Sequence, residues 1–175
     1  TPCGTLFPYT TLFRSDVSVP FTATGLTSET DYDFYVRADC GPGDVSNWVG
    51  PESFTTAITP VTVVVNDPAI NNTYCYDNNE FKEWLFVSSD GMTAVEVVFN
   101  GGTIEDGTGS TDRFRVFDGF DDNAPVLYDS DVDGTDLAGV SLTANSGAAY
   151  MLLESDIFGS CQSGIDIEVP FDFDV

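Results

Sequence analysis

The sequence contains no histidine, and this removes a large part of enzyme chemistry. Ser-His-Asp triads and Cys-His pairs need an imidazole as general base, and many zinc sites mix histidine with cysteine or glutamate. A glycosidase needs only two carboxylates in a cleft, but no pocket-forming pattern accompanies the acidic residues of this chain. We therefore expect a binding protein and not an enzyme.

Basic residues are scarce: 5 Lys and Arg stand against 29 Asp and Glu, for a formal net charge of -24. Proteins bind nucleic acids and anionic membrane surfaces through Lys and Arg, so we expect neither as a partner. An acidic surface attracts divalent cations and basic partners instead. Solubility in salty surroundings is the simpler explanation for most of this charge.

The sequence also has no apolar run long enough to span a membrane, no recognisable signal peptide and little helical periodicity. Instead, 16 Gly and 9 Pro separate short runs rich in Val, Phe, Tyr and Thr, a pattern typical of strands and turns. Hydrophobic residues make up 42% of the chain, enough for a packed core. We predict an all-β fold in part of a longer secreted or cell-surface protein.

Residues 5–15 (TLFPYTTLFRS) resemble one reading frame of a sequencing-library adapter. We therefore treat residues 1–15 as an artefact and exclude them from the fold prediction. A genuine strand is the competing interpretation, because several of these residues are aromatic or β-branched. The exclusion leaves three cysteines, Cys40, Cys75 and Cys161.

Residues 16–57 predict short strands separated by turns. Three strands are expected there, at 17–23, 32–38 and 52–56. The segment Leu26-Thr27-Ser28-Glu29-Thr30-Asp31-Tyr32 resembles the Leu-x-Pro-x-Thr-x-Tyr corner of fibronectin type III domains, with Ser28 in place of proline. The resemblance implies a structural role for Tyr32, whose hydroxyl would bond to the upstream backbone. It covers only the carboxyl-terminal half of that domain, and a half sandwich cannot bury its inner face, so we expect this part to be poorly stable alone.

Residues 58–69 are expected to form a linker and a first strand, and residues 70–175 a second domain. The close spacing of strand-like runs and Gly, Asp and Asn turns is typical of a β-sandwich. Strands are expected at 61–65, 83–87, 94–99, 113–117, 126–128, 140–143, 149–153 and 165–169.

The segment Asp112-Arg113-Phe114-Arg115-Val116-Phe117-Asp118-Gly119 resembles the Asp-Gly strand and turn of CUB domains. Ser155-Asp156 and Gly164-Ile165 resemble the family's later Ser-Asp and Gly-aromatic motifs, with Ile165 in place of the aromatic residue. The resemblance implies a CUB-like antiparallel β-sandwich of the jelly-roll type in residues 70–175, with an extracellular, non-catalytic role.

Calcium-binding members of that family use a Glu, the Asp before the Asp-Gly strand and the Asp of the Ser-Asp loop. The resemblance therefore implies Glu105, Asp112 and Asp156 as calcium ligands. Calcium takes six to eight hard oxygen ligands, and loop carbonyls and water can complete such a set. Three ordinary solvated carboxylates are the alternative.

A second acidic run, Asp129-Ser130-Asp131-Val132-Asp133-Gly134-Thr135-Asp136, starts like an EF-hand loop. The twelfth position is Val140, where that loop requires a bidentate Glu, and no helix flanks it in the sequence. We therefore interpret this run as an acidic hairpin loop.

Cys75 and Cys161 lie near opposite ends of the CUB-like region, and we expect a disulfide between them. The partner of Cys40 is expected in the absent part of the fibronectin domain. Five aromatic residues could line a carbohydrate platform, but core packing is the simpler interpretation. They are Tyr74, Tyr76, Phe81, Trp84 and Phe86.

Two functions agree with these observations. The first is a binding or adhesion module of an extracellular protein, stabilised by calcium, with a protein or carbohydrate ligand at the cell surface. The alternative is an accessory region of a secreted peptidase or glycoside hydrolase whose catalytic domain lies outside this sequence. Fold analogy does not choose the ligand.

Overall fold

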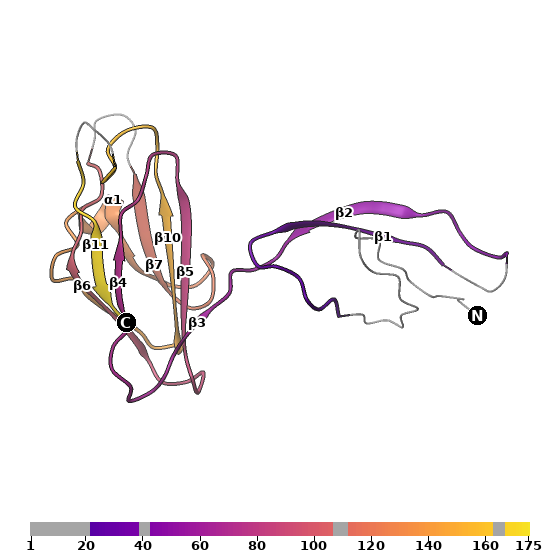
Figure 1. Cartoon of the computed structure of the whole chain (residues 1–175). Helices are drawn as coiled ribbons and strands as arrows, with labels where there is room; N and C mark the ends of the chain where they lie inside the picture. Colours follow the sequence, from indigo (N-terminus) through magenta and orange to yellow (C-terminus); the bar gives the residue numbers. More distant parts are fainter. Residues whose placement is uncertain (1–21, 39–42, 107–111, 163–166) are drawn as a thin grey trace. The chain divides into compact units, whose positions relative to one another are not determined.

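The structure is a computed structural model, and it describes residues 22–38, 43–106, 112–162 and 167–175 (Figure 1). The chain divides into two compact units, Thr1–Thr59 and Pro60–Val175. The adapter-like residues, Cys40 and most of the strand expected at 17–23 lie outside the described residues. Among the described residues, no helix has the length and apolar character needed to cross a membrane.

In its described residues, the first unit contains a two-stranded antiparallel sheet of β1 (Asp31–Val36) and β2 (Val49–Thr55). Tyr32 pairs with Phe54, and strand alternation places these two rings and Phe34 on one face. On the other face, Asp31 and Asp33 accept hydrogen bonds from Thr55 and Ser53. The hairpin therefore has one aromatic face and one polar face.

The hydroxyl oxygen of Tyr32 accepts a hydrogen bond from the Thr27 N–H, 3.0 Å away and five residues upstream. The hydroxyl thus bonds to upstream backbone, which is what the fibronectin-like motif implies for a structural tyrosine. No described residue of this unit is buried, including Tyr32 and the other aromatic residues of the hairpin.

The second unit is a β-sandwich, so the predicted all-β fold is confirmed. One sheet has five strands in the order β3-β5-β10-β7-β8: β3 (Val61–Val63), β5 (Phe81–Ser88), β10 (Ala148–Glu154), β7 (Arg113–Asp118) and β8 (Val126–Asp129). The other has four in the order β4-β11-β6-β9: β4 (Asn71–Tyr74), β11 (Phe171–Asp174), β6 (Val95–Gly101) and β9 (Ser141–Ala144). Strand pairs are antiparallel except β3 with β5, which is parallel.

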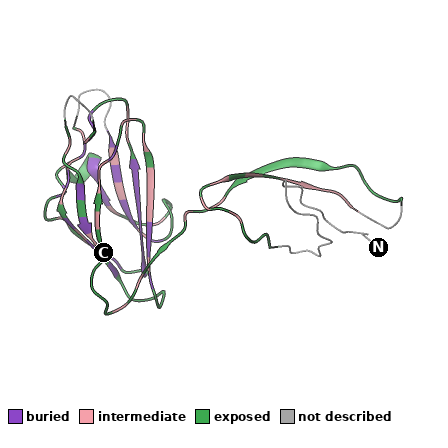
Figure 2. Ribbon diagram, in the orientation of Figure 1, coloured by how far each residue is buried: buried purple, intermediate pink, exposed green. Residues whose placement is uncertain are grey.

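Aromatic side chains fill the space between the two sheets of the second unit. Figure 2 shows the buried residues of this unit in purple along its strands. Phe114 of β7 is fully buried and packs with its ring centroid 5.1 Å from that of Phe171 and 5.7 Å from that of Phe99. Strands β6 and β11 alternate between buried and less buried residues, because one face of their sheet covers the core. Full burial of each such ring contributes about 1.5–3 kcal/mol.

The carboxyl-terminal strand differs from its predicted position. A strand was expected at 165–169, but residues 167–169 are not in a strand, and β11 begins at Phe171. Pro170, which has no backbone N–H for a sheet, precedes it directly. Phe171 and Phe173 face the core, whereas Ile167 and Val169 are exposed.

The acidic run at 129–136 is not the hairpin loop that we expected. It contains a one-turn helix, α1 (Ser130–Asp133). The Asp129 side chain caps it by accepting the N–H of Asp131, and Asp133 in turn accepts the N–H of Asp129. The prediction was wrong because an Asp side chain can accept backbone N–H groups at the start of a helix as well as in a turn.

Candidate metal centre

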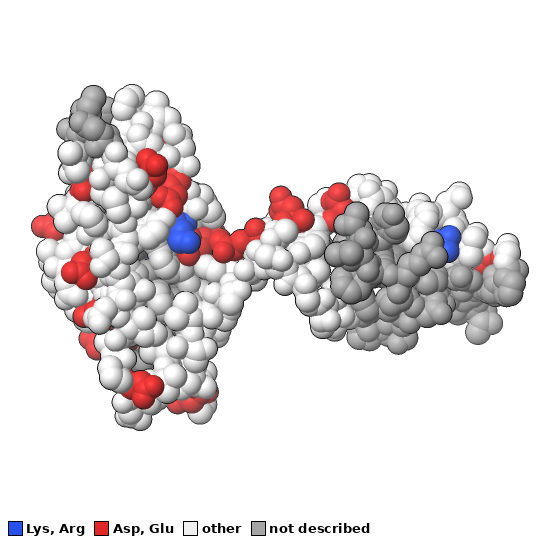
Figure 3. Space-filling model, viewed as in Figure 1, with Lys and Arg blue, Asp and Glu red and all other residues white. Residues whose placement is uncertain are grey.

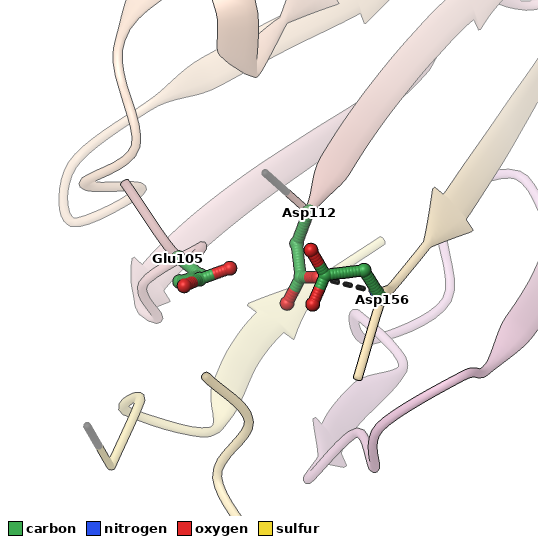
Figure 4. A group of neighbouring side chains, drawn as sticks. All are labelled: Glu105, Asp112 and Asp156. Atoms are coloured by element: carbon green, nitrogen blue, oxygen red, sulfur yellow. Dashed lines mark hydrogen bonds between the residues drawn. The ribbon is translucent and has the colours of Figure 1, made fainter. Parts of the chain in front are cut away.

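The three predicted calcium ligands come together at one end of the sandwich (Figure 4). Asp112 directly precedes β7 and Asp156 follows β10 by two residues, and these strands are antiparallel neighbours whose register pairs Arg113 with Glu154. Glu105 lies in the connection between β6 and β7. One carboxylate oxygen from each of the three residues lies within 4.8 Å of the other two.

Asp112 is the buried member of the cluster, with 1% of its surface exposed. Its Oδ1 accepts the Asp156 N–H at 2.7 Å, the contact drawn as a dashed line in Figure 4. Its Oδ2 is also buried and has no hydrogen-bond partner in the described part of the chain. The same holds for Oδ2 of Asp156, whose Oδ1 accepts the Phe158 N–H. Buried carboxylate oxygens without partners are costly unless a cation neutralises them.

The surroundings of Asp112 disfavour its charged form in the absence of a cation. Burial raises the pKa of the Asp112 carboxyl, and the negative charges of Asp156 and Glu168 add to this. The hydrogen bond from the Asp156 N–H acts in the opposite direction without cancelling the effect. A divalent cation at this position would favour the ionised form of all three carboxyls.

Tyr76 connects two of the loops that carry the cluster. It is fully buried, and its hydroxyl donates to the carbonyl of Gly159 at 3.1 Å and accepts the Glu105 N–H at 3.3 Å. Burial raises its pKa, and the nearby Asp112 carboxylate raises it further, so the phenol keeps its proton. Sequence analysis placed Tyr76 in the core and missed this role, because its partners are 29 and 83 residues away.

A disulfide joins Cys75 to Cys161, as expected from the sequence, with 5.5 Å between the two Cα atoms. It connects the residue after β4 to the loop between β10 and β11, which also carries Asp156 and Gly159. The Sγ of Cys161 lies 3.4 Å from the Tyr76 carbonyl oxygen. The disulfide and Tyr76 thus anchor the same loop from adjacent positions.

Two hollows border the cluster. A hollow of about 480 Å³ lies beside Glu105 and Asp112, and α1 contributes Ser130 and Asp131 to its lining. A second hollow, of about 540 Å³, lies on the other side of Glu105 and includes Glu168. The two hollows therefore border Glu105 and Asp112, whereas the Oδ2 atoms of Asp112 and Asp156 are themselves buried.

The nearest cation to the cluster in sequence, Arg113, is engaged elsewhere. Its guanidinium pairs with Asp129 at 2.6 Å and with Asp131 at 3.2 Å. The hydrogen bond with Asp129 raises the pKa of Arg113, and the contact correspondingly lowers that of Asp129. Acidic side chains are spread over the face shown in Figure 3, where Lys and Arg are rare.

No protein-family model matches this chain, and no curated protein sequence matches it. Among solved structures, the chain is similar to the CUB1-EGF-CUB2 domains of rat MASP-1, with 14% sequence identity and a TM-score of 0.44. The similar region covers 65% of this chain and 41% of that chain, so the chain spans less than half the length of that structure. At this identity and score, the function has to be argued from the metal centre itself.

Proposed function

We propose that the second unit, Pro60–Val175, is a CUB-like, calcium-stabilised binding module of an extracellular protein, and that it does not catalyse a reaction. The observation that carries this proposal is the convergence of Glu105, Asp112 and Asp156 around two buried oxygens without hydrogen-bond partners. Burial of unpaired carboxylates without a cation destabilises the folded protein, because the desolvation of the charged groups is not offset by any favourable interaction.

The donor set favours calcium among the common metal ions. All three side chains offer hard carboxylate oxygens, and the chain has no histidine. Cys75 and Cys161 are joined in a disulfide and offer no thiolate, so the chemistry of a zinc site is not available at this cluster. The ligands lie in loops, and calcium tolerates the variable geometry that loops impose better than magnesium does.

A cation bound by these residues would join the β6–β7 connection, the start of β7 and the β10–β11 loop. Loops joined in this way form a rigid surface for a ligand, which we propose to be a protein or carbohydrate at the cell surface. The disulfide supports a secreted or cell-surface location, because disulfides persist in oxidising compartments.

For the first unit, we propose the carboxyl-terminal half of a fibronectin type III domain. Support comes from the Tyr32 hydroxyl, which accepts the upstream Thr27 N–H, and from the aromatic face of the β1–β2 hairpin. The adapter-like origin of residues 1–15 stays an interpretation of the sequence.

The experiment compares thermal melts of the chain in excess calcium and in chelator. A ligand at about 100 times its dissociation constant stabilises the native state by about 2.7 kcal/mol. We expect this shift in the wild type, its loss in Asp112→Ala, and its retention in Asp67→Ala. Asp67 is an exposed acid that follows β3. Strand β3 pairs with the end of β5 that is far from the three acids, so Asp67 serves as a control outside the cluster. A wild type whose melt does not respond to calcium would overturn the proposal.

A further inference from the structure

Gly159 lies so close to the side chain of Glu105 that a residue with a Cβ atom would clash with it. A Cβ atom added to Gly159 would lie 2.3 Å from the Glu105 Cγ, 2.6 Å from its Cδ and 2.8 Å from its Cβ. All three distances are shorter than nonbonded carbon atoms tolerate. The Glu105 side chain therefore crosses the β10–β11 loop at Gly159, where the loop carries no side chain.

The backbone of Gly159 is tied to the same neighbour. Its carbonyl accepts the Tyr76 hydroxyl, and that hydroxyl accepts the Glu105 N–H. Glu105 is thus held to the loop at its main chain through Tyr76 and at its side chain through direct contact. Both contacts are buried, since Tyr76 is fully buried and Gly159 is buried as well.

We propose that Gly159 is a positioning residue of the metal centre, which lets the Glu105 carboxylate reach Asp112 and Asp156. The proposal rests on the calcium site proposed above. A side chain at position 159 would push Glu105 away from the loop, and its carboxylate could then no longer lie within 4.8 Å of the other two. Neighbours that orient metal ligands commonly contribute 10- to 100-fold to metal affinity.

The chain offers a matched control for the backbone conformation of Gly159. Its φ of +59° is in the left-handed region, where any substitution by alanine is strained. Gly91 has a φ of +66°, and a Cβ there would meet no atom within 4 Å. It lies in the turn between β5 and β6, at the other end of the sandwich. Gly91→Ala therefore imposes a similar backbone strain without the contact to Glu105.

The test is calorimetric titration of calcium into the wild type, Gly159→Ala and Gly91→Ala, at a temperature where all are folded. We expect Gly159→Ala to weaken calcium binding at least about tenfold and Gly91→Ala to leave it within about twofold, as for a distant site. If the wild type binds calcium and Gly159→Ala binds it equally well, the positioning role is wrong. If the wild type binds no calcium, the proposed site itself is wrong.

A double-mutant cycle separates positioning from general damage. Glu105→Ala removes the Cγ and Cδ atoms, which are the two that would lie closest to the new methyl group, and keeps the Cβ at 2.8 Å. If Gly159 acts through Glu105, then Gly159→Ala causes little further loss of affinity in the Glu105→Ala background. We also compare melting temperatures in chelator. The difference between the double variant and Glu105→Ala should be smaller than the difference between Gly159→Ala and the wild type. Equal losses in both backgrounds would overturn the proposal, even if Gly159→Ala alone is poorly folded.

Discussion

The two units of this chain are made of the same kinds of residue but differ in how far they remove them from water. In the first unit, the β1–β2 hairpin carries Tyr32, Phe34 and Phe54 on one face, yet none of its described residues is buried. In the second unit, Phe114 and Phe171 are fully buried between two sheets. In the second unit, two sheets face one another across the buried aromatic residues, and a sheet has a core only when another layer covers its apolar face.

This contrast also explains where a metal centre can form. Asp112 is buried because it precedes a central strand of a five-stranded sheet, and a second sheet covers that strand. Two acids of the first unit, Asp31 and Asp33, are exposed and accept hydrogen bonds from Thr and Ser hydroxyls. Burial of a carboxylate near a core disfavours its charged form, and this applies to Asp112.

The largest expected difference between the units is in amide exchange. Amides of β10, between β5 and β7, should exchange only on global unfolding, whereas those of β1 and β2 should exchange by local opening. We expect β10 to be protected at least about 1,000-fold more strongly, from the stability of ordinary domains. Hydrogen-deuterium exchange read by mass spectrometry of peptides measures this, and equal protection of both units would remove the contrast.

Loss of one aromatic side chain should cost far more in the second unit than in the first. Phe114→Ala leaves a cavity in the core and should lower the free energy of unfolding by roughly 3–5 kcal/mol. Phe54 is 38% exposed, and Phe54→Ala should cost about 1 kcal/mol or less, the order of an aromatic pair contact.

Tryptophan fluorescence in urea can follow each unit separately. The chain has two tryptophans, Trp48 in the first unit and Trp84 in the second. Trp48→Phe leaves a reporter of the sandwich alone, and Trp84→Phe leaves a reporter of the hairpin unit. Similar losses for Phe114→Ala and Phe54→Ala would show that the first unit has a core of its own.

Removal of the Cys75–Cys161 disulfide should destabilise the second unit only. The two cysteines are 86 residues apart, and closure of such a loop contributes about 4 kcal/mol in the chain-entropy account. We expect the Cys75→Ala/Cys161→Ala variant to unfold at a lower urea concentration by the Trp84 signal, with the Trp48 signal unchanged. A parallel shift in both signals would mean that the two units unfold together.

The smallest expected effect concerns Asp112 and its dependence on pH. Burial raises the pKa of this carboxyl, so the folded protein without calcium holds the proton more tightly than the unfolded chain does. The stability due to this proton is present at pH below the ordinary carboxyl value and is lost as pH rises through the raised pKa. Asp112→Asn cannot ionise and therefore avoids this loss.

In chelator at neutral pH, we expect Asp112→Asn to be as stable as the wild type or more stable by roughly 1–2 kcal/mol, the order of the cost of a buried polar group without a partner. In excess calcium the order should reverse, since the variant loses a ligand charge. Melts over a range of pH, with Asp67→Asn as the control, measure both effects. A variant that is less stable than the wild type in chelator at every pH would contradict the expected direction of the effect.

Much of the fold followed from local patterns. Alternation of apolar residues predicted strands close to β5, β6, β7 and β10, since strand periodicity depends only on neighbouring residues. Strand β11 was misplaced and β4 was not predicted, because both are four-residue edge or closing strands whose pairing partners are distant in sequence. The helix α1 was missed because Asp favours turns and helix caps alike.

The candidate site divides in the same way. Glu105, Asp112 and Asp156 were named from the resemblance to CUB domains, and Asp112 and Asp156 each lie in a short motif that carries this resemblance. Tyr76 and Gly159 were not found, because their roles consist of contacts to loops far away in the chain. A buried tyrosine and a loop glycine carry no local signal that distinguishes a support of the metal centre from ordinary core and turn residues.

Composition and pattern alone therefore determined the all-β class, the acidic surface and the absence of imidazole chemistry, and the resemblance to CUB domains named the three acidic residues. Tertiary structure decided that these residues meet, that Asp112 is buried with an unpaired oxygen, and that Gly159 leaves room for Glu105. The physical reason is that strand propensity and charge belong to single residues and their neighbours. Desolvation, pKa shifts and steric fit depend on what the folded chain brings within a few ångströms.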